Sequence, residues 1–322
     1  MHWCDQCELD HAGLGREVFR PAVADRFSAW SRRGMEYFEY RDNPFISLNL
    51  EYSMGFRDII GKDTWVRTAY RRIRRCYVTR REISFLRLPL YGVHHTNCHI
   101  EPPPNLLLIT IAYNRADMIG HQLRLLPKYL SDSFRHIVVD NSSDRSVRHK
   151  IERLCKERGV GYVSLPHNFY TYSSNSHGLA LNWVYRHLVL AINPQYVGFL
   201  DHDVFPIRNH SILEILASQP AYGPKEVRGN ASYLWPGFSF YQTSLLMGKN
   251  VDFKPGVMNG AIVDTGGMLP INILFNNSKQ HPVFAEACYE RIVSGSAISS
   301  KTIEWLKIDG INTWLHCLGA GH

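Results

Sequence analysis

The stretch Leu106-Leu107-Leu108-Ile109-Thr110-Ile111-Ala112 is a short apolar run that follows Glu101-Pro102-Pro103-Pro104. Apolar runs of this length are typical of strands that are buried on both faces of a parallel sheet. The stiff proline segment before the run is typical of a boundary between two parts of a chain. We therefore expect residues 106–112 to form the first strand of a parallel sheet, with a domain boundary at residue 104.

The segments that follow alternate between helical and strand patterns. Helical patterns cover 118–130, 147–158 and 178–191, and apolar strand patterns cover 136–140, 161–165 and 196–200. This alternation predicts an α/β fold with a mostly parallel, doubly wound sheet flanked by helices. Residues 233–241 alternate aromatic and small side chains, as in an antiparallel or mixed strand. We expect the final third of the chain to be helical with loops.

The composition is that of an ordinary globular protein, with 45% hydrophobic and 20% charged residues among 322. It excludes a disordered chain. No stretch approaches the roughly 20 apolar residues that span a bilayer, and the first residues lack the layout of a signal peptide. Seven scattered cysteines fit reduced thiols better than a disulfide framework. These features predict a cytoplasmic protein.

The formal charge of +7 has its densest source in Arg71-Arg72-Ile73-Arg74-Arg75 and Arg80-Arg81. A membrane, a nucleic acid or a nucleotide could use such a patch, and a solvated helix face is the simpler explanation. No zinc-finger pair, RNA-recognition motif or helix-turn-helix spacing supports a nucleic-acid partner. We expect no nucleic-acid binding, and a peripheral membrane contact stays an open alternative.

The apolar run 196–200 is followed directly by Asp201-His202-Asp203, which contains two acidic residues. Ligands of open parallel sheets bind at the carboxyl ends of the strands. Both carboxylates can approach one cation there, and oxygen ligands suit Mg²⁺ or Mn²⁺, which would neutralise a diphosphate leaving group. A solvated acidic turn is the alternative. The position favours a metal site made by Asp201 and Asp203.

Three segments, each at the end of a predicted strand, together resemble a known family. They are Thr110-Ile111-Ala112-Tyr113-Asn114-Arg115, Val138-Val139-Asp140-Asn141-Ser142-Ser143 and Phe199-Leu200-Asp201-His202-Asp203. They look like the nucleotide-binding half of the GT-A fold of glycosyltransferases, and are most similar to its family 2 members. The resemblance implies a GT-A-like (Rossmann-like) sheet. Residues 1–104 would be an aromatic and basic N-terminal accessory region, 105–210 the nucleotide-sugar half and 211–322 the acceptor half of a catalytic domain 105–322.

The resemblance also implies which residues bind the donor. Ala112, Asn114 and Arg115 would lie beside the nucleotide, Asp140 would bind the base, and Asp201 with His202 would complete this part of the site. The alternative for Asp140, Asn141 and Ser142 is a turn or helix-capping role.

Asn175-Ser176-His177-Gly178-Leu179-Ala180-Leu181-Asn182 resembles the family's small-residue helix start, where the backbone comes close to the ribose and diphosphate. Backbone N–H groups at a helix N-terminus favour phosphate. His177, Gly178 and Asn182 are thus donor-site candidates. Asn175 or Ser176 could equally be a plain N-cap.

Asp264 in Val263-Asp264-Thr265-Gly266-Gly267 precedes two glycines that would let an acceptor come close. In inverting members of the family a carboxylate in this region takes the proton of the acceptor hydroxyl. The family's usual acidic pair is absent here, so Asp252, Glu286 and Glu304 remain competitors, as does a structural role for Asp264.

His316, in Trp314-Leu315-His316-Cys317-Leu318-Gly319, resembles the late histidine that completes the cation's ligand shell in many GT-A enzymes. An imidazole nitrogen is an acceptable ligand for manganese. A structural role is the alternative for His316, and His322 is a weaker candidate.

Two further groups are open to more than one interpretation. Cys4, Cys7 and His11 could form a zinc site with His94, His95 and Cys98, but the long spacing fits no standard finger and favours unliganded cysteines. Trp235-Pro236-Gly237-Phe238-Ser239-Phe240 could stack against a sugar, although such residues are more often core.

The sequence therefore predicts an Mn²⁺- or Mg²⁺-dependent glycosyltransferase that moves a sugar from a UDP- or GDP-linked donor to a hydroxyl of a glycan, lipid-linked or other acceptor. Inversion at the anomeric centre is expected, and retention is compatible with the sequence. A nucleotidyltransferase would show a Gly-rich phosphate loop, which residues 112–117 do not form. An inactive scaffold that binds a membrane or protein through its N-terminal region is the other alternative.

Overall fold

The computed structural model describes residues 64–98, 101–166, 168–170, 172–275, 282–293 and 300–318. A compact unit runs from Arg72 to the end of the chain and begins inside helix α3 (Thr64–Arg87). The predictions for Cys4, Cys7, His11 and His322 lie outside the described residues, and the boundary at residue 104 stays a prediction. Within the described ranges, no helix is both long enough and apolar enough to cross a membrane.

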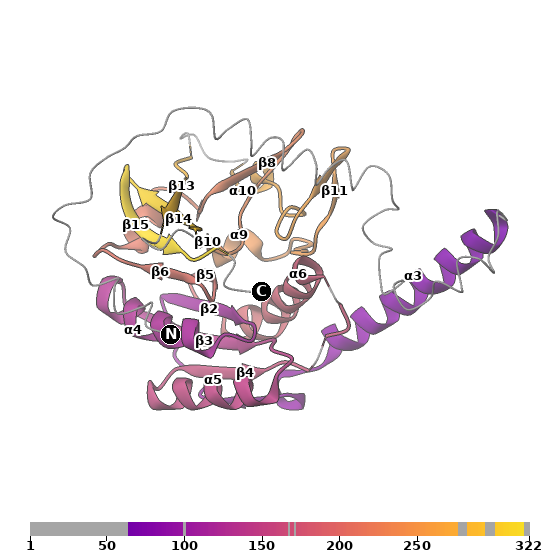
Figure 1. Ribbon diagram of the computed structural model, residues 1–322, viewed down its shortest axis with the longest axis horizontal. Coiled ribbons are helices and arrows are strands. Elements are labelled where there is room, and N and C mark those ends of the chain that lie inside the picture. The colour runs from indigo at the N-terminus through magenta and orange to yellow at the C-terminus, as the bar shows by residue number, and fades with distance from the viewer. Residues whose placement is uncertain are drawn as a thin grey trace. The chain divides into compact units, whose positions relative to one another are not determined.

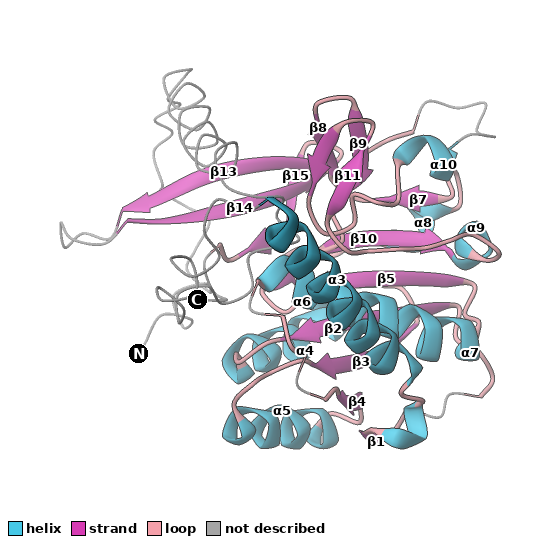
Figure 2. Cartoon of the chain, turned by 90° about the vertical axis from the view of Figure 1, so that its right-hand side faces the viewer, coloured by secondary structure: helices cyan, strands magenta, loops and turns pink. Residues whose placement is uncertain are grey.

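A mostly parallel sheet organises this unit (Figure 2). Among the described residues it has seven strands, in the order β1-β4-β3-β2-β5-β10-β7. The four strands from β4 to β5 are parallel, whereas β1, β10 and β7 run antiparallel to their neighbours. Their bounds are β1 (His94–Thr96), β4 (Gly161–Ser164), β3 (Phe134–Asp140), β2 (Leu106–Ala112), β5 (Tyr196–Asp201), β10 (Phe238–Gln242) and β7 (Ala221–Tyr222). The predicted α/β sheet is confirmed.

Helices cover both faces of this sheet (Figure 1). All seven residues of β2 are buried, and alternate ones face opposite sides. Leu107 belongs to the same buried cluster as Leu179 of α6 (Ser173–Val184), and Leu108 to that of Leu126 of α4 (Ala116–Tyr129). A strand with apolar partners on both sides needs the continuous apolar run that the sequence shows.

The other helices of this layer follow the predicted order. Helix α5 (Arg145–Glu157) precedes β4, and its N-cap Asp144 accepts from the backbone N–H groups of Ser146 and Val147. Helix α6 begins at Ser173 rather than at residue 178, and it continues through a π-helical turn (Tyr185–Val189) and α7 (Leu190–Ile192).

The prediction of a helical final third was wrong. In the described ranges this part of the chain forms a second, antiparallel sheet in the order β13-β14-β15-β6. The bounds are β13 (Glu286–Val293), β14 (Ser300–Ile308), β15 (Ile311–His316) and β6 (Val204–Pro206). Asp309 and Gly310 both have positive φ and form the two-residue turn between β14 and β15. Asp-Gly is a strong hairpin signal, because such turns require φ > 0 at both positions.

Short elements connect the two sheets. A hairpin of β8 and β9 precedes β10, and a hairpin of β11 and β12 follows it. Their bounds, with those of the short helices, are η3 (Leu90–Gly92), α8 (Ile212–Leu216), β8 (Lys225–Arg228), β9 (Ala231–Leu234), α9 (Thr243–Leu246), β11 (Gly256–Met258), β12 (Ala261–Val263) and α10 (Ile271–Phe275).

Candidate active site at the carboxyl edge of the sheet

The Asp-His-Asp turn lies between β5, which ends at Asp201, and β6, which begins at Val204. The side chain of Gln122 on α4 holds the backbone of this turn in place. Its buried amide donates to the carbonyl oxygens of Asp201 (2.9 Å) and Val204 (3.0 Å) and accepts from the Thr110 hydroxyl (2.7 Å). The two carboxylates are therefore presented by a turn whose backbone is held at both ends.

His316 lies beside Asp203 because of the second sheet. The register of β15 and β6 places His316 opposite Val204. Nε2 of His316 is 3.6 Å from Oδ1 of Asp203, and Nδ1 is 2.6 Å from Oε2 of Glu304 on β14. The backbone N–H of Cys317 also donates to the Asp203 carbonyl oxygen. The structure thus brings together the predicted residues Asp203 and His316, and adds Glu304 as the partner of the imidazole.

The charges in this cluster shift its protonation. Burial alone would lower the pKa of His316, but the Glu304 hydrogen bond and the charges of Asp203 and Asp201 outweigh it and raise this pKa. Burial also raises the pKa of Asp203, against the lowering effect of His316 and His202. The carboxylates of Asp203 and Glu304 on either side of His316 hold its ring in one orientation. This is the arrangement by which carboxylates orient metal-binding histidines.

His177 joins the site from the first turns of α6. Its Nε2 lies 3.3 Å from Oδ1 of Asp201, and both side chains are about a fifth exposed, at 22% and 23%. The hydroxyl of Thr265 donates to the Ser174 carbonyl oxygen, so the loop that carries Asp264 is tied to the same end of α6. The predicted donor residue His177 is therefore close to the Asp-His-Asp turn.

Trp235 and Gly237 pack against this cluster. The Trp235 ring lies 4.7 Å from the His316 ring, at an interplanar angle of 34°. A Cβ on Gly237 would lie 2.4 Å from Oδ2 of Asp201 and 2.2 Å from the Trp235 ring, so no larger residue fits without displacing them. Of the aromatic run considered for sugar stacking, Phe238 and Phe240 are core. Trp235 alone of these three is partly exposed at the site.

The loop after β2 is tied to the loop after β3. The side-chain oxygen of Asn114 accepts from the backbone N–H groups of Ser143 and Asp144, and its amide donates to the Ser143 hydroxyl. Arg115 forms an ion pair with Asp117 (2.7 Å), and that hydrogen bond raises the pKa of Arg115. Ala112 is buried. The predicted nucleotide contacts of Ala112, Asn114 and Arg115 stay predictions.

Asp140 is fully buried, and both its carboxylate oxygens have protein partners. Oδ1 accepts from the backbone N–H of Ser142 (2.8 Å), and Oδ2 accepts from the Tyr162 hydroxyl (3.0 Å). The structure thus shows the turn role that was the alternative for Asp140, and its contact with a base stays a prediction. His202 is also buried, and its Nε2 has no hydrogen-bond partner among the described residues.

Gly178 and Asn182 face protein. A Cβ on Gly178 would lie 2.7 Å from the Cα of Lys254, so the close backbone approach predicted here is made by the chain itself. The Asn182 amide donates to Asp252 (2.6 Å), and its oxygen accepts from the Phe253 N–H (2.8 Å). Both residues therefore fix α6, and a nucleotide contact for them stays a prediction.

Asp264 is an exposed carboxylate in the loop after β12. Its Oδ1 accepts from the backbone N–H of Thr265 (2.7 Å), whereas Oδ2 has no hydrogen bond or ion pair within the described part of the chain. Among its competitors, Asp252 is bonded to Asn182 and Glu304 to His316, whereas Glu286 is exposed on β13. Asp264 stays the predicted base.

The donor set at the turn suits a divalent cation, although no three His, Cys, Asp or Glu side chains in the described ranges are placed to hold one as they stand. Asp201 and Asp203 offer carboxylate oxygens, and His316 offers Nε2 while Glu304 holds Nδ1. An ion there would replace the contacts of His177 with Asp201 and of His316 with Asp203. The chemistry of the residues fits Mn²⁺ or Mg²⁺.

In the described half of the possible zinc site, Cys98 and His94 are bonded to other protein groups. Cys98 is buried, and its thiol donates to the carbonyl oxygens of Thr96 and Tyr162. Burial raises the pKa of Cys98 to about 11, which keeps the thiol protonated. His94 is bonded to Glu152 (2.6 Å).

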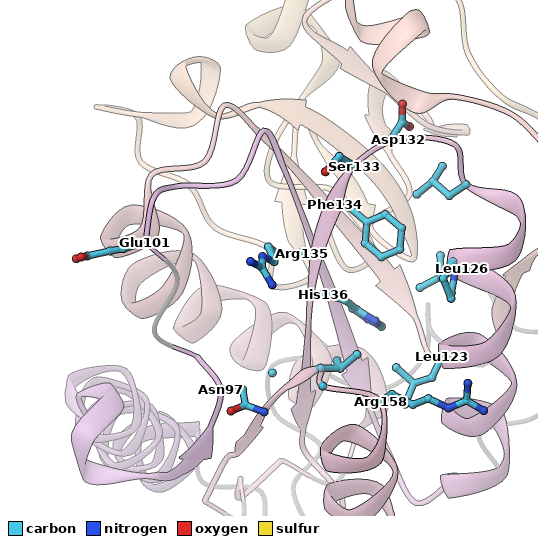
Figure 3. A pocket seen from close by; sticks show the side chains of 15 residues that line it. Asn97, Glu101, Leu123, Leu126, Asp132, Ser133, Phe134, Arg135, His136 and Arg158 are labelled. Atoms are coloured by element: carbon cyan, nitrogen blue, oxygen red, sulfur yellow. The ribbon is translucent and has the colours of Figure 1, made fainter.

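A separate pocket of about 860 Å³ lies at the opposite edge of the sheet, around the starts of β3 and β4 (Figure 3). Arg135 and Arg158 lie on two sides of His136. The His136 ring is bonded to Thr110, and burial lowers its pKa to about 3. None of the predicted site residues lines this pocket.

Comparisons with known proteins give weak likenesses. The chain matches no protein-family model and no curated protein. Among solved structures it is similar to S. aureus TarS (18% identity, TM-score 0.32, 46% of this chain and 30% of that one). It is also similar to the mannosyltransferase PcManGT from Pyrobaculum calidifontis in complex with GDP-Man and Mn²⁺ (17%, 0.33, 53% and 52%) and to the bifunctional glycosyltransferase WbbM (9%, 0.32, 45% and 32%). In each case the match spans about half of the other chain or less.

Proposed function

We propose that this protein is a metal-dependent glycosyltransferase that uses a nucleotide-diphospho-sugar donor. The observation that carries the proposal is the cluster of Asp201, Asp203, His316 and Glu304 at the carboxyl edge of a parallel sheet. Ligands of such sheets bind at this edge. A buried histidine fixed by a carboxylate on one nitrogen and turned toward a second carboxylate has the donor chemistry of a cation site.

Each group then has a defined task. A divalent ion bound by Asp201, Asp203 and His316 would neutralise charge on the donor diphosphate. His177, next to Asp201, would donate a hydrogen bond to a phosphate oxygen at the start of α6. The partly exposed face of Trp235 offers an apolar surface to the sugar ring.

The transfer itself would be a direct displacement with inversion. The acceptor hydroxyl oxygen attacks the anomeric carbon while the bond from that carbon to the diphosphate oxygen breaks. The diphosphate leaves with the bonding electrons, and the hydroxyl proton passes to a carboxylate, for which we propose Asp264. The donor would be UDP- or GDP-linked, and the acceptor a glycan, a lipid-linked sugar or another hydroxyl compound.

Nucleotide binding tests this proposal. UDP, GDP, CDP and dTDP are each added with and without Mn²⁺, and the thermal unfolding midpoint is followed, because a ligand that binds the folded state raises it. We expect one nucleotide to give an Mn²⁺-dependent rise that is absent from the double variant Asp201→Ala, Asp203→Ala. The matched control Glu157→Ala, Glu214→Ala removes two exposed carboxylates from helices and should keep the rise. No Mn²⁺-dependent rise with any nucleotide would contradict the proposal and favour the inactive scaffold.

A further inference from the structure

Helix α3 has one face packed on the compact unit and one face exposed. On the packed face Phe85 is buried, and Glu82 accepts from the Tyr170 hydroxyl (2.5 Å) and pairs with Lys254 (2.9 Å). Ile73 precedes Glu82 by two and a half helical turns and so lies on the opposite face. Ile73 is 69% exposed and Tyr77, one turn further on, is 58% exposed. Apolar side chains therefore line the outer face.

Arginines surround these apolar residues. Arg72, Arg80 and Arg87 are all exposed, and in the described part of the chain none of them has a carboxylate partner. Glu82 is the single acidic residue between Thr64 and Arg87, and Lys254 neutralises it. The outer face of α3 thus combines uncompensated positive charge with exposed apolar side chains.

The packed face holds α3 close to the carboxyl edge of the sheet. The backbone carbonyls of Leu86 and Leu88 bond to side chains of His187 and Trp183, which lie in the helical segment that starts with α6, so the two helices lie side by side (Figure 2). The Arg81 guanidinium lies 4.7 Å over the Phe169 ring. Lys254, the partner of Glu82, packs its backbone against Gly178, next to His177 of the site.

We propose that the outer face of α3 docks on the surface of an anionic lipid bilayer. Guanidinium groups bind lipid phosphates, and Ile73, Tyr77 and Ile83 reach the boundary between headgroups and acyl chains. A nucleic acid would use the arginines but would leave the two isoleucines exposed to water, so a bilayer satisfies more of this face. The docked chain would hold the carboxyl edge of its sheet beside the membrane. This docking is a further property of the protein and does not depend on the proposed sugar transfer.

Vesicle flotation tests the docking with the full chain. Vesicles of phosphatidylcholine mixed equally with phosphatidylglycerol are compared with vesicles of phosphatidylcholine alone. We expect binding to the anionic vesicles alone, weakened by salt. The variant with Arg72, Arg80 and Arg87 all changed to Gln should bind on the order of a hundredfold more weakly, because each arginine contributes about fivefold.

Two matched variants separate this surface from general electrostatics. Changing Arg145, Lys150 and Lys156 to Gln removes the same charge from the exposed side of α5, which has no large exposed apolar residue. This control should bind like the original protein. Ile73→Gln with Tyr77→Gln should weaken binding at least about tenfold through lost apolar burial, whereas Val227→Gln with Ile262→Gln should not.

Three results would overturn the docking proposal. They are failure to float with anionic vesicles, equal loss in the α5 and α3 charge variants, or binding to a single-stranded oligonucleotide that needs the α3 arginines but not Ile73 and Tyr77. Thermal unfolding midpoints confirm that each variant is folded. Nucleotide binding, measured separately, shows whether the sugar-transfer proposal holds independently.

Discussion

Replacing Glu304 by Gln tests how the histidine of the site is held. Glu304 and His316 are joined at 2.6 Å with side chains only 8% and 12% exposed, and the pKa of His316 is raised in the folded protein. Such a histidine contributes stability that is complete below its unfolded pKa of about 6.5 and is lost as pH rises through the folded pKa. Gln removes the charge of Glu304, so the pKa of His316 should fall and the pH-dependent stability should shrink.

The expected size follows from the geometry. A buried hydrogen bond to a charged group contributes about 1.5–3 kcal/mol. In a unit of this length about 2 kcal/mol lowers the thermal unfolding midpoint by about 4–8 °C. The loss in Glu304→Gln should be largest near about pH 6, where His316 is charged, and smaller near about pH 9.

The assay combines thermal unfolding at both pH values with an NMR titration of the His316 ring. Glu290→Gln is the matched control, since Glu290 also accepts one hydrogen bond at 2.6 Å on the same ribbon, from Trp305, but is exposed. It should change neither the titration nor the midpoint appreciably. An unchanged His316 titration in Glu304→Gln, or a loss of stability that is equal at both pH values, would refute this reasoning.

Three other changes test the rest of the site. Gly237→Ala should lower the free energy of unfolding by about 1–3 kcal/mol and weaken Mn²⁺-dependent nucleotide binding, because its Cβ would collide with Asp201 and Trp235. Denaturant unfolding measures the stability, and calorimetry measures the binding. Gln122→Leu leaves two carbonyl oxygens of the turn without their hydrogen-bond donor and should lower the free energy of unfolding by about 2–5 kcal/mol. Gln219→Leu is the control, because the Gln219 amide also donates to a backbone carbonyl but lies away from the turn. It should cost stability without weakening nucleotide binding. Asp264→Asn should lower kcat about 10²–10⁴-fold with nucleotide affinity unchanged; unaltered turnover would remove Asp264 as the base.

Much of the fold was predictable because strands that are buried on both faces of a sheet need continuous apolar runs in the sequence. Residues 106–112 and 196–200 are such runs, and both became central strands. The late strands were missed because they have no continuous apolar run. Most described residues of β13 are exposed, and charged residues interrupt the apolar ones in both β13 and β14. Turn chemistry could have corrected this, since Asn259-Gly260 and Asp309-Gly310 both occupy two-residue hairpin turns with positive φ.

The site was predictable where chemistry follows a strand end and unpredictable where it depends on tertiary pairing. Asp201 and Asp203 follow β5 directly, but only the pairing of β15 with β6 brings His316 to them. Glu304 was considered as a base, and its bond to His316 requires the register of β14 and β15. The role of Gln122 could have been suspected from the sequence, because Gln122 is a polar residue among the apolar residues of the buried helix face.

The central claim is that the Asp-His-Asp turn and His316 hold a divalent ion for a nucleoside diphosphate. Its most direct measurement is a titration of Mn²⁺ into the protein, followed by the electron paramagnetic resonance signal of the free ion, with the nucleotide that stabilises the fold present in excess. The account predicts one bound Mn²⁺ per chain, with affinity reduced about 10–100-fold in Glu304→Gln and binding abolished in Asp201→Ala with Asp203→Ala. Binding that is equal in all three proteins would contradict it.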